Sequence, residues 1–354
     1  MRTAASWFTA LSLLLFLTSA GPAAPVVAPE ELNWTRFPSI PDPVGFAGSF
    51  AGVSGGVLLV AGGANFPGAR PWEGGEKVWH DWIFVLPKPF GKWQIAGHLP
   101  HKLAYGVSIT TTEGILCVGG CNSQRCFSDV CLMRWRNGHA ECRNLPALPQ
   151  PTANACGALV GHKVYIAGGQ SKLDATEAAA KFWKLDLKHV NRGWEELEPW
   201  PGPARILAVA GVYRGDFFLF SGAELHSGPN GKAARQYLTD AYRFTPGKGW
   251  KALAALPRAA VAAPSPVIVR GGELLVVSGD DGKLLNFEPK AKHPGFPRDV
   301  LAYTPRDDSW RRMGEPALSR ATAPVVQWHD WWVIVNGEVR PGERTPEVWG
   351  LNER

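Results

Sequence analysis

One short pattern, repeated six times along the 354 residues, most constrains the fold of this chain. Each copy is an apolar run that ends in a small residue followed by glycine. The copies are Val57–Gly63, Ile115–Gly120, Val164–Gly169, Phe217–Gly222, Leu274–Gly279 and Trp332–Gly337. Their last glycines lie 49 to 58 residues apart. A period of this length indicates one supersecondary unit used six times, because such a unit buries its apolar face only against its neighbours.

Each unit carries further landmarks that define its strands. A stretch of small residues precedes the apolar run, as at residues 105–109, and a stretch led by aspartate follows it, as at residues 81–85. A segment led by tryptophan closes the unit, for example at Trp250. This order resembles the kelch repeat, a four-stranded blade of a β-propeller. The 40 Gly and 30 Pro residues also favour many short strands joined by tight turns. We expect an all-β fold, a single six-bladed kelch-type β-propeller over residues 32–354.

The sixth unit is short, since the chain ends soon after residues 348–351 without a segment led by tryptophan. The missing pattern lies near the other end, at residues 33–38, which contain Trp34. We therefore expect this N-terminal segment to form the outer strand of the last blade. Closing the ring in this way would remove two exposed sheet edges.

The first 31 residues are expected to lie outside the propeller. A basic start at Arg2, an apolar run at residues 7–17 and small residues at 18–20 are typical of a secretory signal peptide. We assign residues 1–20 to this signal peptide and residues 21–31 to a flexible leader. The apolar run is too short to span a membrane, and no other segment offers a span. The sequence thus predicts an exported protein, periplasmic or secreted.

All six cysteines fall within one 40-residue window, which suits local disulfides in an exported protein. They are Cys117, Cys121, Cys126, Cys131, Cys142 and Cys156. Their spacing lacks the paired Cys-x-x-Cys of a zinc site, so we favour disulfides over metal or redox chemistry. The pairing stays open: Cys121 with Cys126 would close a short loop, and Cys117 with Cys131 would join neighbouring strands.

Charge and histidine spacing exclude some classes of ligand. The formal net charge is +6, but basic residues are scattered rather than clustered, so nucleic acid is not an expected partner. A mild positive balance suits a small anionic ligand instead. No His-x-His or His-Glu-x-x-His motif occurs, so we expect no metal. Asp280 and Asp281, which follow the fifth apolar run, are interpreted as a solvated turn rather than as ligands.

The strand order predicts where a ligand would bind. In an antiparallel blade, the residues after each small-Gly pair share a face with the residues before each first strand, and six such loops converge on the central channel. The loop after Gly337 carries Glu338 and Arg344, and the loop after Gly63 carries Arg70. Ring closure would place these two loops side by side. One carboxylate and two guanidinium groups would then face one pocket, where each guanidinium could bind a carboxylate.

These loops resemble those of a known family. Asn336–Glu338, Pro341–Gly342 and Arg344–Thr345 resemble the signature of bacterial sialic acid mutarotases (N-acetylneuraminate epimerases), which are periplasmic six-bladed kelch propellers. Residues 62–70 and 104–108 resemble two further motifs of the family. In the family's usual order the blade with the glutamate precedes the Gly-Gly-Ala blade. Here the order is reversed, so the chain resembles a cyclically permuted branch.

The resemblance implies an isomerase that interconverts the α and β anomers of N-acetylneuraminate, or of a related sialic acid, without a cofactor. Glu338 would be the proton acceptor and Arg344 its partner in the site. The residues expected to bind this small acidic sugar are Arg70, Asn65, Tyr105 and Trp72. One departure is Leu103, where the family often has arginine, and it leaves the exact sugar acid open.

Three other interpretations start from the same propeller. The main alternative is a non-catalytic kelch propeller that binds glycans or proteins in the periplasm without accelerating anomer exchange. A copper radical oxidase would need Tyr and His ligands with a Cys–Tyr crosslink, and the six tyrosines and clustered cysteines offer no convincing set. A sialidase is disfavoured because its Asp-box motif is not repeated.

Overall fold

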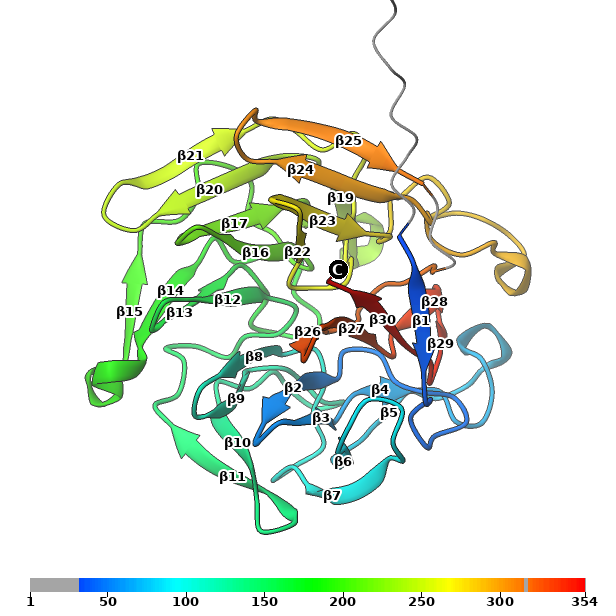
Figure 1. Ribbon diagram of the computed structural model, residues 1–354. Helices are drawn as coiled ribbons and strands as arrows, with labels where there is room; N and C mark the ends of the chain where they lie inside the picture. Colours follow the sequence, from blue (N-terminus) through cyan, green and yellow to red (C-terminus); the bar gives the residue numbers. More distant parts are fainter. Residues whose placement is uncertain (1–31, 315–317, 354) are drawn as a thin grey trace, which may run out of the picture.

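Each of the six repeats folds into one four-stranded antiparallel sheet, and the sheets surround a central axis (Figure 1). The computed structural model describes residues 32–314 and 318–353. The expected six-bladed β-propeller is confirmed. The expected signal peptide, residues 1–20, and leader, residues 21–31, lie outside the described residues. Over the described stretches, no helix is both long and apolar enough to cross a membrane.

The first strand of each blade lies nearest the axis and the fourth lies outermost (Figure 1). Blades 1 and 2 consist of β2 (Phe50–Ser54), β3 (Val57–Ala61), β6 (Trp82–Leu86) and β7 (Gln94–His98), then β8 (Val107–Thr111), β9 (Gly114–Val118), β10 (Val130–Arg136) and β11 (His139–Leu145). Blades 3 and 4 consist of β12 (Cys156–Val160), β13 (Lys163–Ala167), β14 (Phe182–Asp186) and β15 (Trp194–Leu197), then β16 (Val209–Tyr213), β17 (Asp216–Phe220), β20 (Ala241–Thr245) and β21 (Gly249–Leu253). Blades 5 and 6 consist of β22 (Ile268–Arg270), β23 (Glu273–Val277), β24 (Val300–Thr304) and β25 (Ser309–Met313), then β26 (Val325–Trp328), β27 (Trp331–Val335), β30 (Val348–Asn352) and β1 (Trp34–Phe37).

Three blades carry a two-stranded hairpin between their second and third strands. The pairs are β4 (Ala64–Asn65) with β5 (Val78–Trp79), β18 (Ala223–Ser227) with β19 (Ala233–Tyr237), and β28 (Glu338–Arg340) with β29 (Glu343–Arg344). Because each hairpin leaves the end of a second strand, all three stand on one face of the ring. The remaining elements are the short 3₁₀ helices η1 (Pro71–Glu73), η2 (Leu187–Arg192), η3 (Pro229–Gly231) and η4 (Lys290–Lys292).

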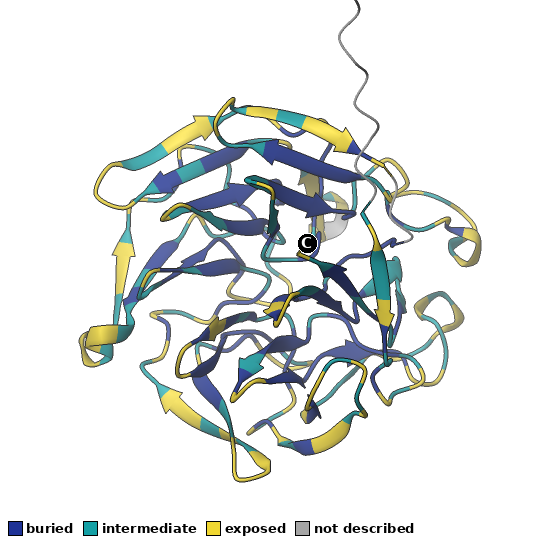
Figure 2. Cartoon of the chain, in the orientation of Figure 1, coloured by how far each residue is buried: buried dark blue, intermediate teal, exposed yellow. Residues whose placement is uncertain are grey.

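The apolar runs form the second strands, and these strands are buried on both faces. All five residues of β3 and of β9 are buried. The core consists of clusters that each join two adjacent blades; for example, Leu59 of blade 1 packs in one cluster with Ile115 of blade 2. Figure 2 shows the buried inner strands and the largely exposed outer ones. The repeated pattern is therefore apolar throughout because each blade packs against a neighbour on both sides.

The N-terminal segment closes the ring as expected. Strand β1 pairs antiparallel with β30, from Trp34 opposite Leu351 to Phe37 opposite Val348, and the two lie side by side in Figure 1. Phe37 is buried and packs edge-on against Trp331, with ring centroids 5.3 Å apart. The last blade is thus built from both ends of the described chain.

In five of the six apolar runs, the last glycine forms a backbone hydrogen bond to the next blade. Gly337 donates its N–H to the carbonyl oxygen of Phe46 in blade 1 at 2.8 Å, just as Gly63 donates to Leu103 in blade 2. The backbone of Gly337 has φ +99°, and a Cβ added there would lie 2.6 Å from the carbonyl oxygen of Ala321. A residue with a side chain would be strained and would clash, so the repeat requires glycine here.

A closed ring of backbone hydrogen bonds surrounds the central channel. It joins one residue from the start of each blade, and these residues have φ between +51° and +66°. They are Gly48, Tyr105, Asn154, Leu207, Ala262 and Thr322. The N–H of each of the six donates to the carbonyl oxygen of the corresponding residue in the preceding blade, at 2.7–2.9 Å. Gly48 of the first blade donates to Thr322 of the last, which closes the ring. We call these six residues the channel ring.

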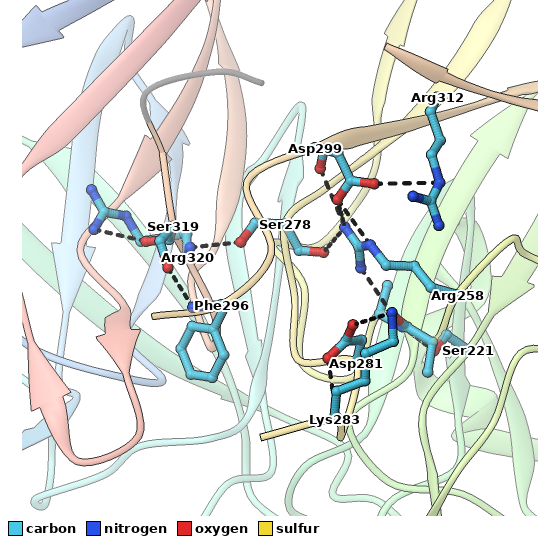
Figure 3. Close-up of polar contacts among 12 residues, drawn as sticks. Ser221, Arg258, Ser278, Asp281, Lys283, Phe296, Asp299, Arg312, Ser319 and Arg320 are labelled. Carbon is cyan, nitrogen blue, oxygen red and sulfur yellow. Dashed lines mark hydrogen bonds and ion pairs between the residues drawn. The ribbon is translucent and has the colours of Figure 1, made fainter. Parts of the chain in front are cut away.

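Buried arginines before the first strands fix several blades in place. Arg258 donates to the carboxylate of Asp299 at 2.6 and 2.9 Å and to the carbonyl oxygen of Ser278 at 3.0 Å (Figure 3). Arg205 binds Asp240 in the same way in blade 4. Because breaking a buried ion pair typically costs about 3–5 kcal/mol, these charges serve the fold rather than a ligand.

The cysteines lie close together, but all six are free thiols. Cys121 and Cys126 face each other across a short antiparallel bridge, and Cys117 lies directly opposite Cys131 on β9 and β10. These are the two pairs that the spacing suggested. The structure confirms their proximity and contains no bond between them.

Candidate active site

A pocket of about 440 Å³ opens above the channel ring, on the face that carries the three hairpins. Its volume falls in the usual range for small-molecule sites, about 300–1,000 Å³. Five of the six channel-ring residues line it, and they also line a smaller cavity of about 90 Å³ inside the channel. The pocket wall includes Lys77, Trp79, Gln170, Arg235, Asp280 and Glu338. We call this cavity the site pocket.

Glu338 and Arg344 lie together, as the sequence predicted. They face each other across β28 and β29, and an Nη atom of Arg344 lies 3.0 Å from a carboxylate oxygen of Glu338. The side chain of Glu338 is 16% exposed and lines the site pocket, whereas that of Arg344 is 3% exposed and lies behind it. Burial alone would lower the pKa of Arg344, but the charge of Glu338 and the phenol of Tyr105 raise it. The guanidinium therefore stays charged and holds the Glu338 side chain in place through this ion pair.

Arg344 also links blade 6 to the next two blades. It donates to the hydroxyl oxygen of Tyr105 at 3.3 Å and to the carbonyl oxygen of Ala64 at 3.4 Å. Its guanidinium carbon lies 4.7 Å from the ring centroid of Phe66. Since Tyr105 accepts this hydrogen bond, its own proton remains available to a ligand in the pocket that it lines.

Lys77 is a pocket residue that the sequence analysis missed. Its ammonium nitrogen lies 5.4 Å from the ring centroid of Tyr105, 5.5 Å from that of Trp79 and 5.8 Å from that of Phe66. Across the described part of the chain, no carboxylate pairs with it. A cation on aromatic faces, with no anion of its own, is suited to bind an acidic ligand. Its place on the loop between β4 and β5 gave no local motif that could have signalled it.

The structure places three other expected binding residues around the hairpins rather than on the pocket wall. Asn65 is fully buried, and its side-chain oxygen lies 2.8 Å from Nε2 of His80. Arg70 forms an ion pair with Glu343 at 3.4 Å. Trp72 packs against the turn between β28 and β29 at Gly342. The contacts of Arg70 and Trp72 position the β28–β29 hairpin, which carries Glu338, whereas Asn65 fixes His80 within blade 1.

Asp280 was interpreted as part of a solvated turn, and its carboxylate does accept a hydrogen bond from the N–H of Gly282 in that turn. The sequence did not predict its second role. Asp280 also lines the site pocket, and its carboxylate accepts a hydrogen bond of 2.7 Å from the hydroxyl of Tyr237. Its neighbour Asp281 does belong to the turn, where it pairs with Lys283 (Figure 3). Its position in the repeat could have indicated this. Asp280 directly follows Gly279, just as Glu338 directly follows Gly337.

The sequence is similar to a known family over most of its length. The family model described as N-acetylneuraminate epimerase matches residues 19–141 and 145–287, which is more than half of the chain. The chain belongs to the N-acetylneuraminate epimerase family. Among relatives of that name, it is 31% identical to one from Haemophilus influenzae (strain 86-028NP) over 234 residues, 59% of each chain. It is 27% identical to one from Pasteurella multocida (strain Pm70) over 232 residues, 58% of each chain.

The chain spans just under three fifths of the length of these curated relatives of the epimerase family. Glu338 and Arg344 lie beyond the residues that the epimerase family model matches, whereas Lys77 and Tyr105 lie within them. Within the described residues, no three His, Cys, Asp or Glu side chains cluster as metal ligands would.

Proposed function

We propose that this protein interconverts the α and β anomers of N-acetylneuraminate, or of a related sialic acid, without a cofactor. The observation that carries the proposal is the pair of Glu338 and Arg344, in which a partly exposed carboxylate lines a pocket and a buried guanidinium fixes it at 3.0 Å. Membership of the epimerase family supports the substrate class. The match to the family model ends before blade 6, which supports the cyclically permuted order.

Glu338 takes the proton from the anomeric hydroxyl. The ring then opens to the keto form, the carbonyl turns, and closure on its other face gives the second anomer. A positioned base contributes roughly 10²–10⁴-fold to such a step. Arg344 holds Glu338 in place as this base through the ion pair at 3.0 Å.

Tyr105 donates the proton that the ring oxygen needs when the ring opens. Its hydroxyl oxygen already accepts a hydrogen bond from Arg344, and the adjacent positive charge stabilises the phenolate that forms in the transition state. Glu338 and Tyr105 therefore flank one guanidinium as base and acid. On ring closure Tyr105 takes its proton back from the attacking hydroxyl, and Glu338 returns its proton to the former carbonyl oxygen.

Lys77 binds the carboxylate of the sugar. It takes the role that the sequence suggested for Arg344 and Arg70, whose guanidinium groups pair with Glu338 and Glu343. Arg70 and Trp72 contribute by holding the hairpin that carries Glu338, and Asn65 contributes by fixing His80 in blade 1.

The reaction takes place outside the cytoplasm, in the periplasm or beyond it. The expected signal peptide over residues 1–20 supports this location.

In that compartment, Cys121 and Cys126 form a disulfide. A protein disulfide oxidant accepts the two electrons, and the two thiol protons are released. The pKa of Cys126 lies below its ordinary value because of its hydrogen bond with Cys121, which favours the thiolate that this exchange needs.

Proton NMR of freshly released α-N-acetylneuraminate tests the proposal. The protein is expected to accelerate conversion to the β anomer, and E338Q to lose at least about 100-fold of this rate. E195Q is the matched control, because Glu195 pairs with Lys184 on the outer part of blade 3, away from the pocket. Y105F tests the acid in the same way. An E338Q rate equal to that of E195Q would remove Glu338 from the catalytic role.

A further inference from the structure

Asp280 holds the same place in blade 5 that Glu338 holds in blade 6. Each is the first residue after the small-Gly pair, and each exchanges two backbone hydrogen bonds of 2.8 and 2.9 Å, Asp280 with Val261 and Glu338 with Ala321. Both line the site pocket. The propeller thus presents two carboxylates to one ligand, and the proposed reaction uses only Glu338.

Neutral donors fix the carboxylate of Asp280. Tyr237 donates to one oxygen at 2.7 Å, and the N–H of Gly282 donates to the other at 3.0 Å. The ring of Tyr237 lies against Gly282, where an added Cβ would come within 2.8 Å of it. Burial and the charge of Asp280 raise the pKa of Tyr237, so its hydroxyl remains a donor. These two bonds leave acceptor capacity on the carboxylate for a ligand in the pocket.

The surroundings of the two carboxylates differ. Glu338 has Arg344 as its ion-pair partner, whereas Asp280 has none within the described residues. Asp280 and Tyr237 come from blades 5 and 4, while Lys77 comes from blade 1, which lies across the ring from blade 4. The site pocket therefore has the Lys77 cation at one end. At the other end the Asp280 carboxylate accepts hydrogen bonds, with Arg235 of the Tyr237 strand beside it.

We propose that Asp280, held by Tyr237, binds hydroxyl groups at the polyol end of the substrate. This inference rests on the proposed function. An ionised carboxylate accepts hydrogen bonds from hydroxyls and repels a second acid group. The pocket consequently favours a ligand with one carboxylate at one end and hydroxyls at the other. Asp280 then sets which sugar acids bind, while Glu338 carries out the proton transfer.

The test compares two sugars with one variant. The first is N-acetylneuraminate, and the second is its seven-carbon analogue, from which the last two side-chain carbons have been removed. D280N is expected to raise KM for the full sugar about 10-fold, as for loss of one hydrogen bond to a charged group, with kcat nearly unchanged. For the shortened sugar, KM should change by no more than about 2-fold, because the hydroxyls that Asp280 would bind are missing.

D281N is the matched control, since Asp281 pairs with Lys283 in the adjacent turn (Figure 3). Y237F keeps the carboxylate but removes its fixing donor, and it should raise KM for the full sugar less than D280N does. An equal rise in KM for both sugars, or no rise in D280N, overturns the proposal. Saturation-transfer NMR on the terminal side-chain protons reports the same contact without turnover. This measurement tests the Asp280 contact even if the wild type accelerates anomer exchange of neither sugar. Such a lack of acceleration would refute the proposed function but not the binding role of Asp280.

Discussion

Substituting Gly337 by alanine tests whether the repeated glycine fixes both the ring and the base beside it. Two costs follow from the structure. An alanine forced into the left-handed region loses about 1–2 kcal/mol. The new Cβ would also lie 2.6 Å from the carbonyl oxygen of Ala321 and 2.9 Å from the Cβ of Ala323, so overpacking adds about 1–3 kcal/mol. We expect G337A to lower the free energy of unfolding by about 2–5 kcal/mol.

G56A provides the matched control for this substitution. Gly56 lies in the turn between β2 and β3, has φ +80° and would place its Cβ in open space. Only the backbone cost applies there, so the expected loss is about 1–2 kcal/mol. Urea unfolding followed by fluorescence of the 16 tryptophans measures both variants. Equal losses would refute the argument that the close contact with Ala321 and Ala323 requires glycine.

The same substitution should slow the reaction in folded protein. Gly337 precedes Glu338 directly, and its N–H is bonded to Phe46 in blade 1. A displacement of the strand end therefore moves the base relative to Tyr105, and a shift approaching 1 Å costs up to about 100-fold in rate. Anomer exchange at a temperature where G337A is folded should show kcat at least about 10-fold below that of G56A. An unchanged kcat would show that the hairpin positions Glu338 without this glycine.

Two further predictions concern single charges. K77M should raise KM for the acidic sugar about 10-fold or more with little change in kcat, because it removes a charged partner of the substrate carboxylate; steady-state exchange rates measure this, and a change confined to kcat would contradict it. Burial raises the pKa of Glu347, but hydrogen bonds from Trp349 and Arg320 lower it below its ordinary value. Its folded-state pKa is thus depressed, so the stability it contributes is present above the unfolded pKa of about 4.3 and is lost as the pH falls further. Urea unfolding at pH 7 and pH 3 measures the change in the free energy of unfolding between the two pH values. This change should be smaller for E347Q than for the wild type, and an equal change would contradict the stabilising role of the Glu347–Arg320 pair.

The fold could be predicted from the sequence because one pattern fixes several levels of structure. The apolar runs predict the second strands, which are buried by a neighbouring blade on each side. The tryptophan of residues 33–38 predicts closure, since only one blade lacked an outer strand. Glu338 and Arg344 were predictable for a local reason: they lie on either side of a tight turn at Gly342, which brings their side chains together whatever the rest of the ring does.

The rest of the site depends on contacts between distant segments. Lys77 belongs to the pocket only because three aromatic rings from blades 1 and 2 surround its ammonium group. Asp280 faces the pocket because Tyr237, 43 residues earlier, binds its carboxylate. Arg70 looked free in the sequence, but its partner Glu343 is 273 residues away. No local pattern reports such pairings, because they depend on how the hairpins of different blades pack.

The channel ring has a consequence for how the protein unfolds. A linear array of repeats can lose its terminal unit and keep the others, but six hydrogen bonds in a closed circle leave no terminal unit to fray. Each ring amide is released only when two blades separate, which also exposes the apolar cluster between them. The six amides should therefore exchange with solvent at similar rates and only through global opening. Glu338 lies in blade 6 and Tyr105 at the start of blade 2. Because the ring opens only as a whole, the distance between these two residues should stay constant until the molecule unfolds.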